Sequence, residues 1–193
     1  MADYKGRVFE YVRNDEASKI KNDISFLIRE LQKSLKEDRY DKLGPGTEQN
    51  PIDFNDIDIS NIDSFYSRNR DIGIFDGMDF KYKYIDISDW DVSNVTDMRY
   101  MFYGCDELKS VGDISGWDVS SVTDMHGMFC ECKFFNQDLS SWNVSNVTDM
   151  EFMFTFCEKF NQDILKWNVS NVIYHLAMFD YCPIKEEYKP KFK

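Results

Sequence analysis

The sequence has 193 residues, of which 42% are apolar and 16% aromatic, a composition that supports a packed core and argues against global disorder. Acidic residues outnumber basic ones 35 to 23 and the net charge is -12, which argues against nonspecific binding to duplex nucleic acid or to anionic membranes. Because no run approaches the roughly 18 apolar residues of a spanning helix and no secretory leader or lipidation motif is visible, we expect a cytoplasmic protein, or a cell-surface one if the sequence is part of a longer chain.

The first predicted element is an amphipathic helix within residues 1–46. Apolar side chains recur at helical intervals between residues 16 and 40, with charged residues between them. Gly44-Pro45-Gly46 then breaks the helix. We expect this segment to cap the first turn of the array that follows. The apolar positions are Ile20, Ile24, Leu27, Ile28, Leu31 and Leu35.

Residues 47–183 contain a tandem repeat whose tryptophans are separated by steps of 27, 25 and 25 residues. About four clear turns follow one degenerate turn near residues 52–77. A single turn of this length cannot bury its own apolar set, so we expect successive turns to stack and to place equivalent side chains in columns. The clearest columns are Trp90, Trp117, Trp142 and Trp167; Phe102, Phe129, Phe154 and Phe179; and Cys105, Cys132, Cys157 and Cys182.

Within each turn the apolar pattern changes period. Met150, Met153, Phe154 and Cys157 have the spacing of one face of a short helix, and residues 167–172 alternate as a strand does. The predicted fold class is therefore α/β: a short leucine-rich-repeat-like solenoid of about 4–5 turns, with one short strand and one short helix per turn. Residues 184–193 are expected to form a mobile, charged C-terminal tail.

The residues that could carry catalysis or bind a metal show no recognisable arrangement. Four of the five cysteines occupy one repeat column, which favours buried packing thiols over a disulfide framework. Cys130-Glu131-Cys132 lacks a second pair at zinc-ligand spacing. His126 occupies a slot that is charged in neighbouring turns, which predicts a surface position, and His175 replaces a repeated methionine. We expect no enzyme, no metal and no cofactor.

Two acidic columns have two possible interpretations. One contains Asp86, Asp113, Asp138 and Asp163, and the other contains Asp97, Asp124 and Asp149. These carboxylates either accept hydrogen bonds that close local turns or form a negative stripe that attracts a basic partner. Residues 44–184 carry 9 basic and 24 acidic side chains, so the net charge of -15 is concentrated in the repeats.

Aromatic residues occupy slots that differ from turn to turn: Tyr100, Tyr103, Phe134, Phe152 and Phe156. Repeated positions are committed to packing, so variable positions are where specificity is expected. Exposed aromatics beside charge are good interface anchors, although burial in the core is the other interpretation of these residues. We take these five and the first acidic column as candidate partner-binding residues.

The repeat resembles a known family. Residues 142–150, Trp-Asn-Val-Ser-Asn-Val-Thr-Asp-Met, and residues 160–163, Phe-Asn-Gln-Asp, are similar to the BspA-like leucine-rich-repeat surface proteins, in the branch of roughly 25-residue repeats long catalogued as a domain of unknown function. The resemblance covers about residues 52–183. It implies a curved solenoid used for protein–protein contact, often in adhesion, and it implies no catalytic residues.

Two functions are compatible with these observations. The first is a non-enzymatic interaction module that binds a protein with a basic surface through its variable face, without direct contact with nucleic acid or membrane. The alternative is an acidic, anti-CRISPR-like inhibitor carried by a phage or mobile element, which would mimic nucleic acid and block the basic channel of a host defence enzyme. The oligomeric state stays open.

Overall fold

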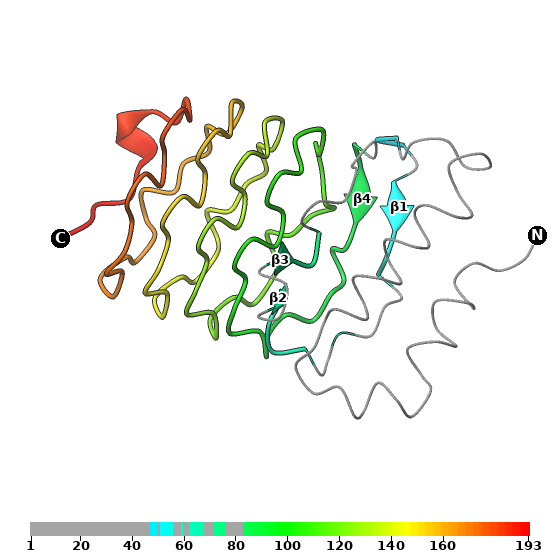
Figure 1. Cartoon of the computed structure of the whole chain (residues 1–193), viewed down its shortest axis with the longest axis horizontal. Helices are drawn as coiled ribbons and strands as arrows, with labels where there is room; N and C mark the ends of the chain where they lie inside the picture. Colours follow the sequence, from blue (N-terminus) through cyan, green and yellow to red (C-terminus); the bar gives the residue numbers. More distant parts are fainter. Residues whose placement is uncertain (1–46, 50, 56–58, 60–61, 68–71, 76–82) are drawn as a thin grey trace, which may run out of the picture.

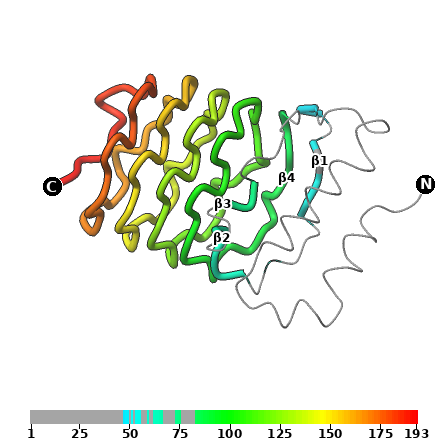
Figure 2. The backbone as a smooth tube through the Cα atoms, in the orientation of Figure 1, coloured from blue at the N-terminus to red at the C-terminus, as the bar shows by residue number. Residues whose placement is uncertain are grey.

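The computed structural model describes residues 47–49, 51–55, 59, 62–67, 72–75 and 83–193. From residue 83 onward, the chain winds into successive coils that lie side by side along the long axis of the molecule (Figure 1). The trace through the Cα atoms shows the same order of coils, from green to red (Figure 2). No helix among the described residues has the length and apolar character needed to cross a membrane. The predicted N-terminal cap, residues 1–46, lies outside the described residues.

Parallel backbone pairing joins successive coils. Strand β1 (Ile52–Asp53) pairs in parallel with β4 (Ile85–Asp86), whereas β2 (Tyr66–Ser67) and β3 (Ile72–Gly73) form a separate antiparallel pair. Single-residue parallel bridges link the later coils to one another. Residues one repeat apart are therefore neighbours in space. The bridges join Asp97 to Asp124, Asp124 to Asp149, and Asp149 to Tyr174.

The short helix predicted in each turn is wrong, because the described part of the chain contains no α-helix and residues 151–156 form consecutive turns. No strand lies at residues 161–172 either. Backbone hydrogen bonds explain the difference: Gly127 donates its N–H to Glu151 at 2.8 Å, and Phe129 donates to Met153 at 3.0 Å. An α-helix would use these N–H groups within its own segment. Consecutive turns bury the same apolar positions as a helix, so spacing alone does not distinguish the two.

Phenylalanine rings form a continuous column through the core. From Phe75 through Phe102, Phe129 and Phe154 to Phe179, successive ring centroids lie 5.2, 5.3, 5.7 and 5.9 Å apart, with interplanar angles between 2° and 8°. The repeat predicts this column, because equivalent residues of stacked turns meet. Buried methionines and cysteines lie in the same core, and they include Met101, Met128, Met153, Cys105, Cys132 and Cys157.

The four tryptophans are buried, and three of them make the same hydrogen bond. The indole N–H groups of Trp90, Trp142 and Trp167 each donate to a backbone carbonyl of an earlier coil at 2.9 Å. The Trp117 ring stacks on that of Trp142 at 6.3 Å, but its Nε1 is buried without a hydrogen-bond partner among the described residues. The step from Trp90 to Trp117 is two residues longer than the later steps.

Residues 184–193, the predicted charged tail, pack against the last coils. Ile184 is buried, and the backbone N–H of Ile164 donates to the carbonyl of Tyr188 at 3.0 Å. Tyr188 ends the 3-10 helix η2 (Glu186–Tyr188). Phe192 then stacks on the ring of His175, with centroids 4.1 Å apart. The high charge of this segment predicted that it would be exposed. The apolar residues between the charged ones pack against the last coils and hold the segment there.

Candidate functional site

An open groove of about 480 Å³ crosses three successive coils. Four of the five predicted aromatic anchors line it, and three of the four are half-buried while Phe156 is 40% exposed. The fifth, Phe134, lies outside this groove, with its ring 5.7 Å from the Lys109 ammonium. The structure therefore gathers most of the variable aromatics on one surface. The lining residues are Tyr100, Tyr103, His126, Cys130, Phe152, Thr155 and Phe156.

Three of the groove aromatics have left-handed backbone conformations, which are uncommon for residues other than glycine. Their φ angles are 54° at Tyr100, 57° at Phe152 and 59° at Phe156. In the intervening coil the position equivalent to Tyr100 and Phe152 is Gly127, with φ of 58°. The same conformation recurs at Glu131, Ala177 and Tyr181, which do not line the groove, so it belongs to the backbone of the repeat and costs on the order of 1–3 kcal/mol at each such residue.

Gly127 leaves space for the Tyr100 ring of the preceding coil. A Cβ atom at this position would lie 2.8 Å from two ring carbons of Tyr100. Any side chain here would push the Tyr100 ring from its place. The absence of a side chain at Gly127 therefore lets the Tyr100 ring keep its position at the groove.

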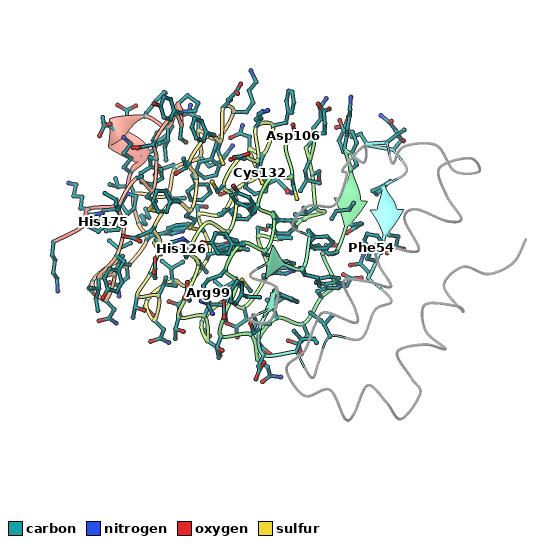
Figure 3. All side chains as sticks on the ribbon, in the orientation of Figure 1. Phe54, Arg99, Asp106, His126, Cys132 and His175 are labelled. Carbon is teal, nitrogen blue, oxygen red and sulfur yellow. The ribbon has the colours of Figure 1, made fainter. Side chains whose placement is uncertain are left out.

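His126, labelled in Figure 3, sits between two groove aromatics. Its ring meets Tyr100 and Phe152 edge to face, with centroids 5.1 and 5.6 Å apart. The sequence predicted a surface histidine, but the side chain is only 20% exposed. The charged residues at the equivalent position of neighbouring turns correctly indicated that the His126 side chain points outward. They did not indicate that aromatic rings cover it.

Arg99 pairs with two carboxylates of the second acidic column, which contains Asp97, Asp124 and Asp149. Its guanidinium bonds Asp97 through Nε at 3.0 Å and Nη2 at 2.6 Å, and it reaches Asp124 at 3.3 Å. The hydrogen bond to Asp97 raises the pKa of Arg99. Burial raises the pKa of Asp124 despite the hydrogen bond from the His126 backbone. The guanidinium also lies 4.0 Å above the Tyr66 ring.

A second open depression, of about 800 Å³, brings together three residues of the first acidic column, Asp86, Asp113 and Asp138. Glu48 and Lys109 also line it. Asp163, the fourth predicted residue, is exposed but lies outside this depression. Three of the four residues of the predicted acidic stripe therefore lie together at this surface.

Each aspartate of that column also closes a local turn. The carboxylate accepts the backbone N–H two residues ahead: Ser115 donates to Asp113 at 3.0 Å and Ser140 to Asp138 at 2.8 Å. Hydrogen bonds from Ser115 lower the pKa of Asp113. At Asp86 burial acts to raise the pKa, but hydrogen bonds from Ser88 outweigh it and the pKa is lowered. The turn-closing interpretation of these residues therefore holds, and it leaves their charge at the surface.

A comparison with protein families shows the family of the chain. The profile described as Mycoplasma protein of unknown function, DUF285, matches residues 72–189. The chain belongs to the DUF285 family. No match was found among curated proteins or among solved structures. The matched DUF285 region contains both the aromatic groove and the paired coils that support it.

The cysteine column of this DUF285 chain packs in the core. The Cys132 and Cys157 thiols each donate to a carbonyl of the preceding coil at 3.0 Å. Burial raises the pKa of both, and it raises the pKa of Cys130, at the groove, to about 12. Because the thiolate is the reactive form, these thiols are poor nucleophiles in the folded protein.

Thiol reactivity provides a test of this packing. With a disulfide reagent at neutral pH, we expect Cys130, Cys132 and Cys157 to react slowly in the folded protein and all five cysteines to react quickly after unfolding. Raising the pH to 9, above the ordinary thiol pKa of about 8.5, should not restore fast reaction at these three positions. Site-resolved mass spectrometry measures the rates, and fast native labelling of Cys132 would contradict the assignment.

Among the residues of this DUF285 chain that the structure describes, one group of side chains has the chemistry to hold a cation. One ligand atom from each of His126, Asp149 and Glu151 lies within 4.8 Å of the other two. From the sequence we expect no metal site, although His126 and Glu151 are one repeat step of 25 residues apart and occupy equivalent positions of neighbouring coils. Their proximity follows from stacking.

Proposed function

We propose that the chain is a non-enzymatic protein-binding module, a leucine-rich-repeat-like solenoid of the BspA type that holds a partner in its aromatic groove. One observation supports this most strongly: residues that break the repeat line the groove, whereas repeated residues fill the core. Aromatic residues that are partly exposed, and fixed by a rigid backbone, supply contact area at a low entropic cost.

The chemistry around the groove favours a partner with basic side chains. Glu151 and Glu131 approach two of the lining residues, since Glu151 lies 3.9 Å from His126 and Glu131 accepts the Tyr103 hydroxyl at 3.4 Å. Arg99 of this chain is an example of a guanidinium bound by aromatic and acidic side chains, because it lies over an aromatic ring while it forms hydrogen bonds with a carboxylate. Cation–π contact and ion pairing would act together on an arginine of the partner.

Photo-crosslinking tests the groove directly. The photoreactive residue p-benzoylphenylalanine is placed at Phe156 in one variant and at Leu165 in a matched control, because both side chains are 40% exposed and only Phe156 lines the groove. After irradiation in lysate of the source cells, we expect position 156 to capture one defined protein and position 165 not to capture it. Excess unlabelled wild-type protein should suppress the adduct.

A competitor variant makes the result specific to the groove. Excess protein carrying Phe152→Ala and Phe156→Ala should leave the adduct in place, since it lacks two lining rings. Equal capture from positions 156 and 165, or equal competition by the double variant, would reject the groove as the binding surface.

The acidic depression supports a second candidate function, the nucleic-acid-mimicking inhibitor of a host defence enzyme. Its support is the placement of Asp86, Asp113 and Asp138 around one open surface. The triple change Asp113→Asn, Asp138→Asn and Asp163→Asn removes charge and keeps the turns, because Asn143 and Asn168 close the equivalent kind of turn elsewhere in the chain. In the inhibitor case this variant loses its partner and added salt does the same. In the groove case the adduct at position 156 persists.

A further inference from the structure

The wall of the groove contains a triangle of ligand atoms from two neighbouring coils. His126 Nδ1 lies 3.5 Å from Asp149 Oδ1 and 3.9 Å from Glu151 Oε2. The three side chains are 20%, 22% and 26% exposed, so the triangle is partly shielded and still open on one side. Coil stacking creates this group, since His126 belongs to one coil and both carboxylates belong to the next.

Neighbouring groups restrict the orientation of these side chains. Edge contacts with Tyr100 and Phe152 hold the His126 ring from both sides. The backbone N–H of Glu151 donates to Asp149 Oδ1 at 2.9 Å, which fixes the shorter carboxylate. Outer contacts of this kind orient the ligands of protein metal sites. Glu151, the longest of the three side chains, is the group that can move to close the triangle.

The charge balance in this part of the stack favours a cation. In the preceding coil Arg99 bridges Asp97 and Asp124, but no lysine or arginine of the described residues pairs with Asp149 or Glu151. The only basic group that reaches these two carboxylates in the described chain is His126. Two carboxylates thus face one imidazole.

We propose that His126, Asp149 and Glu151 bind a divalent transition-metal ion, with Zn²⁺ as the preferred ion. One nitrogen and two carboxylate oxygens suit Zn²⁺, which takes such ligands at about 2.0–2.2 Å and often keeps an open position for water or a partner. The imidazole nitrogen disfavours Ca²⁺ and Mg²⁺, which prefer all-oxygen ligands. This inference goes beyond the proposed function, because the ion binds the isolated chain without any partner.

Calorimetry and thermal unfolding with defined ions test the site in the whole chain. We expect Zn²⁺ to bind with a stoichiometry of about one and to raise the melting temperature, since a ligand that binds the folded state stabilises it. Ca²⁺ and Mg²⁺ at the same concentration should leave the melting temperature unchanged. His126→Gln and Glu151→Gln should each weaken Zn²⁺ binding at least about tenfold.

Matched controls separate this site from other zinc ligands. His175→Gln changes the other histidine, which stacks on Phe192 away from the triangle, and should bind Zn²⁺ as the wild type does. Glu158→Gln changes an exposed carboxylate of the same coil as Glu151 and should also have no effect. Co²⁺ should give visible bands without thiolate charge transfer. A thiolate band, or undiminished Zn²⁺ binding by either site variant, would overturn the proposal, as would the absence of Zn²⁺ binding by the wild type.

Discussion

Replacing Phe129 with alanine is expected to lower the free energy of unfolding by about 3–5 kcal/mol, a large part of the stability of a domain of this size. Phe129 is fully buried at the middle of the ring column. Its ring lies 5.3 Å from Phe102, 5.7 Å from Phe154 and 4.2 Å from Phe135. Its removal leaves a cavity against rings of the coils on both sides, which the rigid ladder of backbone bonds prevents from collapsing.

Denaturation in urea, followed by circular dichroism, measures the loss. The control is Phe156→Ala, which removes a ring of the same size that is 40% exposed and stacks on Tyr181 at 4.6 Å. This control should cost only about 1 kcal/mol, the value of one aromatic contact. Similar losses in the two variants would mean that the ring column does not carry the core.

Trp142→Phe is expected to destabilise the fold by about 1–3 kcal/mol more than Trp117→Phe. Both substitutions remove the same volume from the same column. At Trp142 the substitution also removes a buried hydrogen bond, from the indole N–H to the carbonyl of Ile114 at 2.9 Å. At Trp117 it removes a buried N–H that has no partner among the described residues, so the cost of desolvating that group disappears.

The same urea titration, with both variants measured side by side, checks this difference. Trp167→Phe provides a further reference, because its indole N–H donates to Leu139 at 2.9 Å and should behave as Trp142 does. Equal losses for Trp117→Phe and Trp142→Phe would show that the Trp117 indole is hydrogen-bonded in solution.

The side-chain columns could be predicted from the sequence, whereas the local backbone could not. Residues that recur at a fixed step must occupy equivalent environments, so the alignment of Phe102, Phe129 and Phe154 follows from the repeat alone. The spacing of Met150, Met153 and Phe154 suggested a helix, because it reports only which positions face the core. Whether their N–H groups bond within the segment or to the next coil depends on the neighbouring coil, which this spacing does not encode.

Only part of the candidate site could be predicted from the sequence. Tyr100, Phe152 and Phe156 were recognised as variable positions and do line the groove. Phe134 was chosen by the same criterion but lies near Lys109 outside it, because variability does not say which face a position occupies. The closeness of His126 to Glu151 was overlooked, although the two residues are one repeat step of 25 residues apart and the repeat places them in the same column.

Hydrogen bonds between neighbouring coils determine how the number of repeats in such a chain can change. Along the groove side each coil gives its N–H groups to its successor, so its backbone depends on immediate neighbours and on no distant segment. Stability in such a system is a sum of nearest-neighbour terms. A whole repeat unit can therefore be inserted or deleted without changes to the other units. Inserting a unit moves the surfaces on its two sides apart by one strand spacing, about 4.8 Å, and deleting one brings them closer by the same distance.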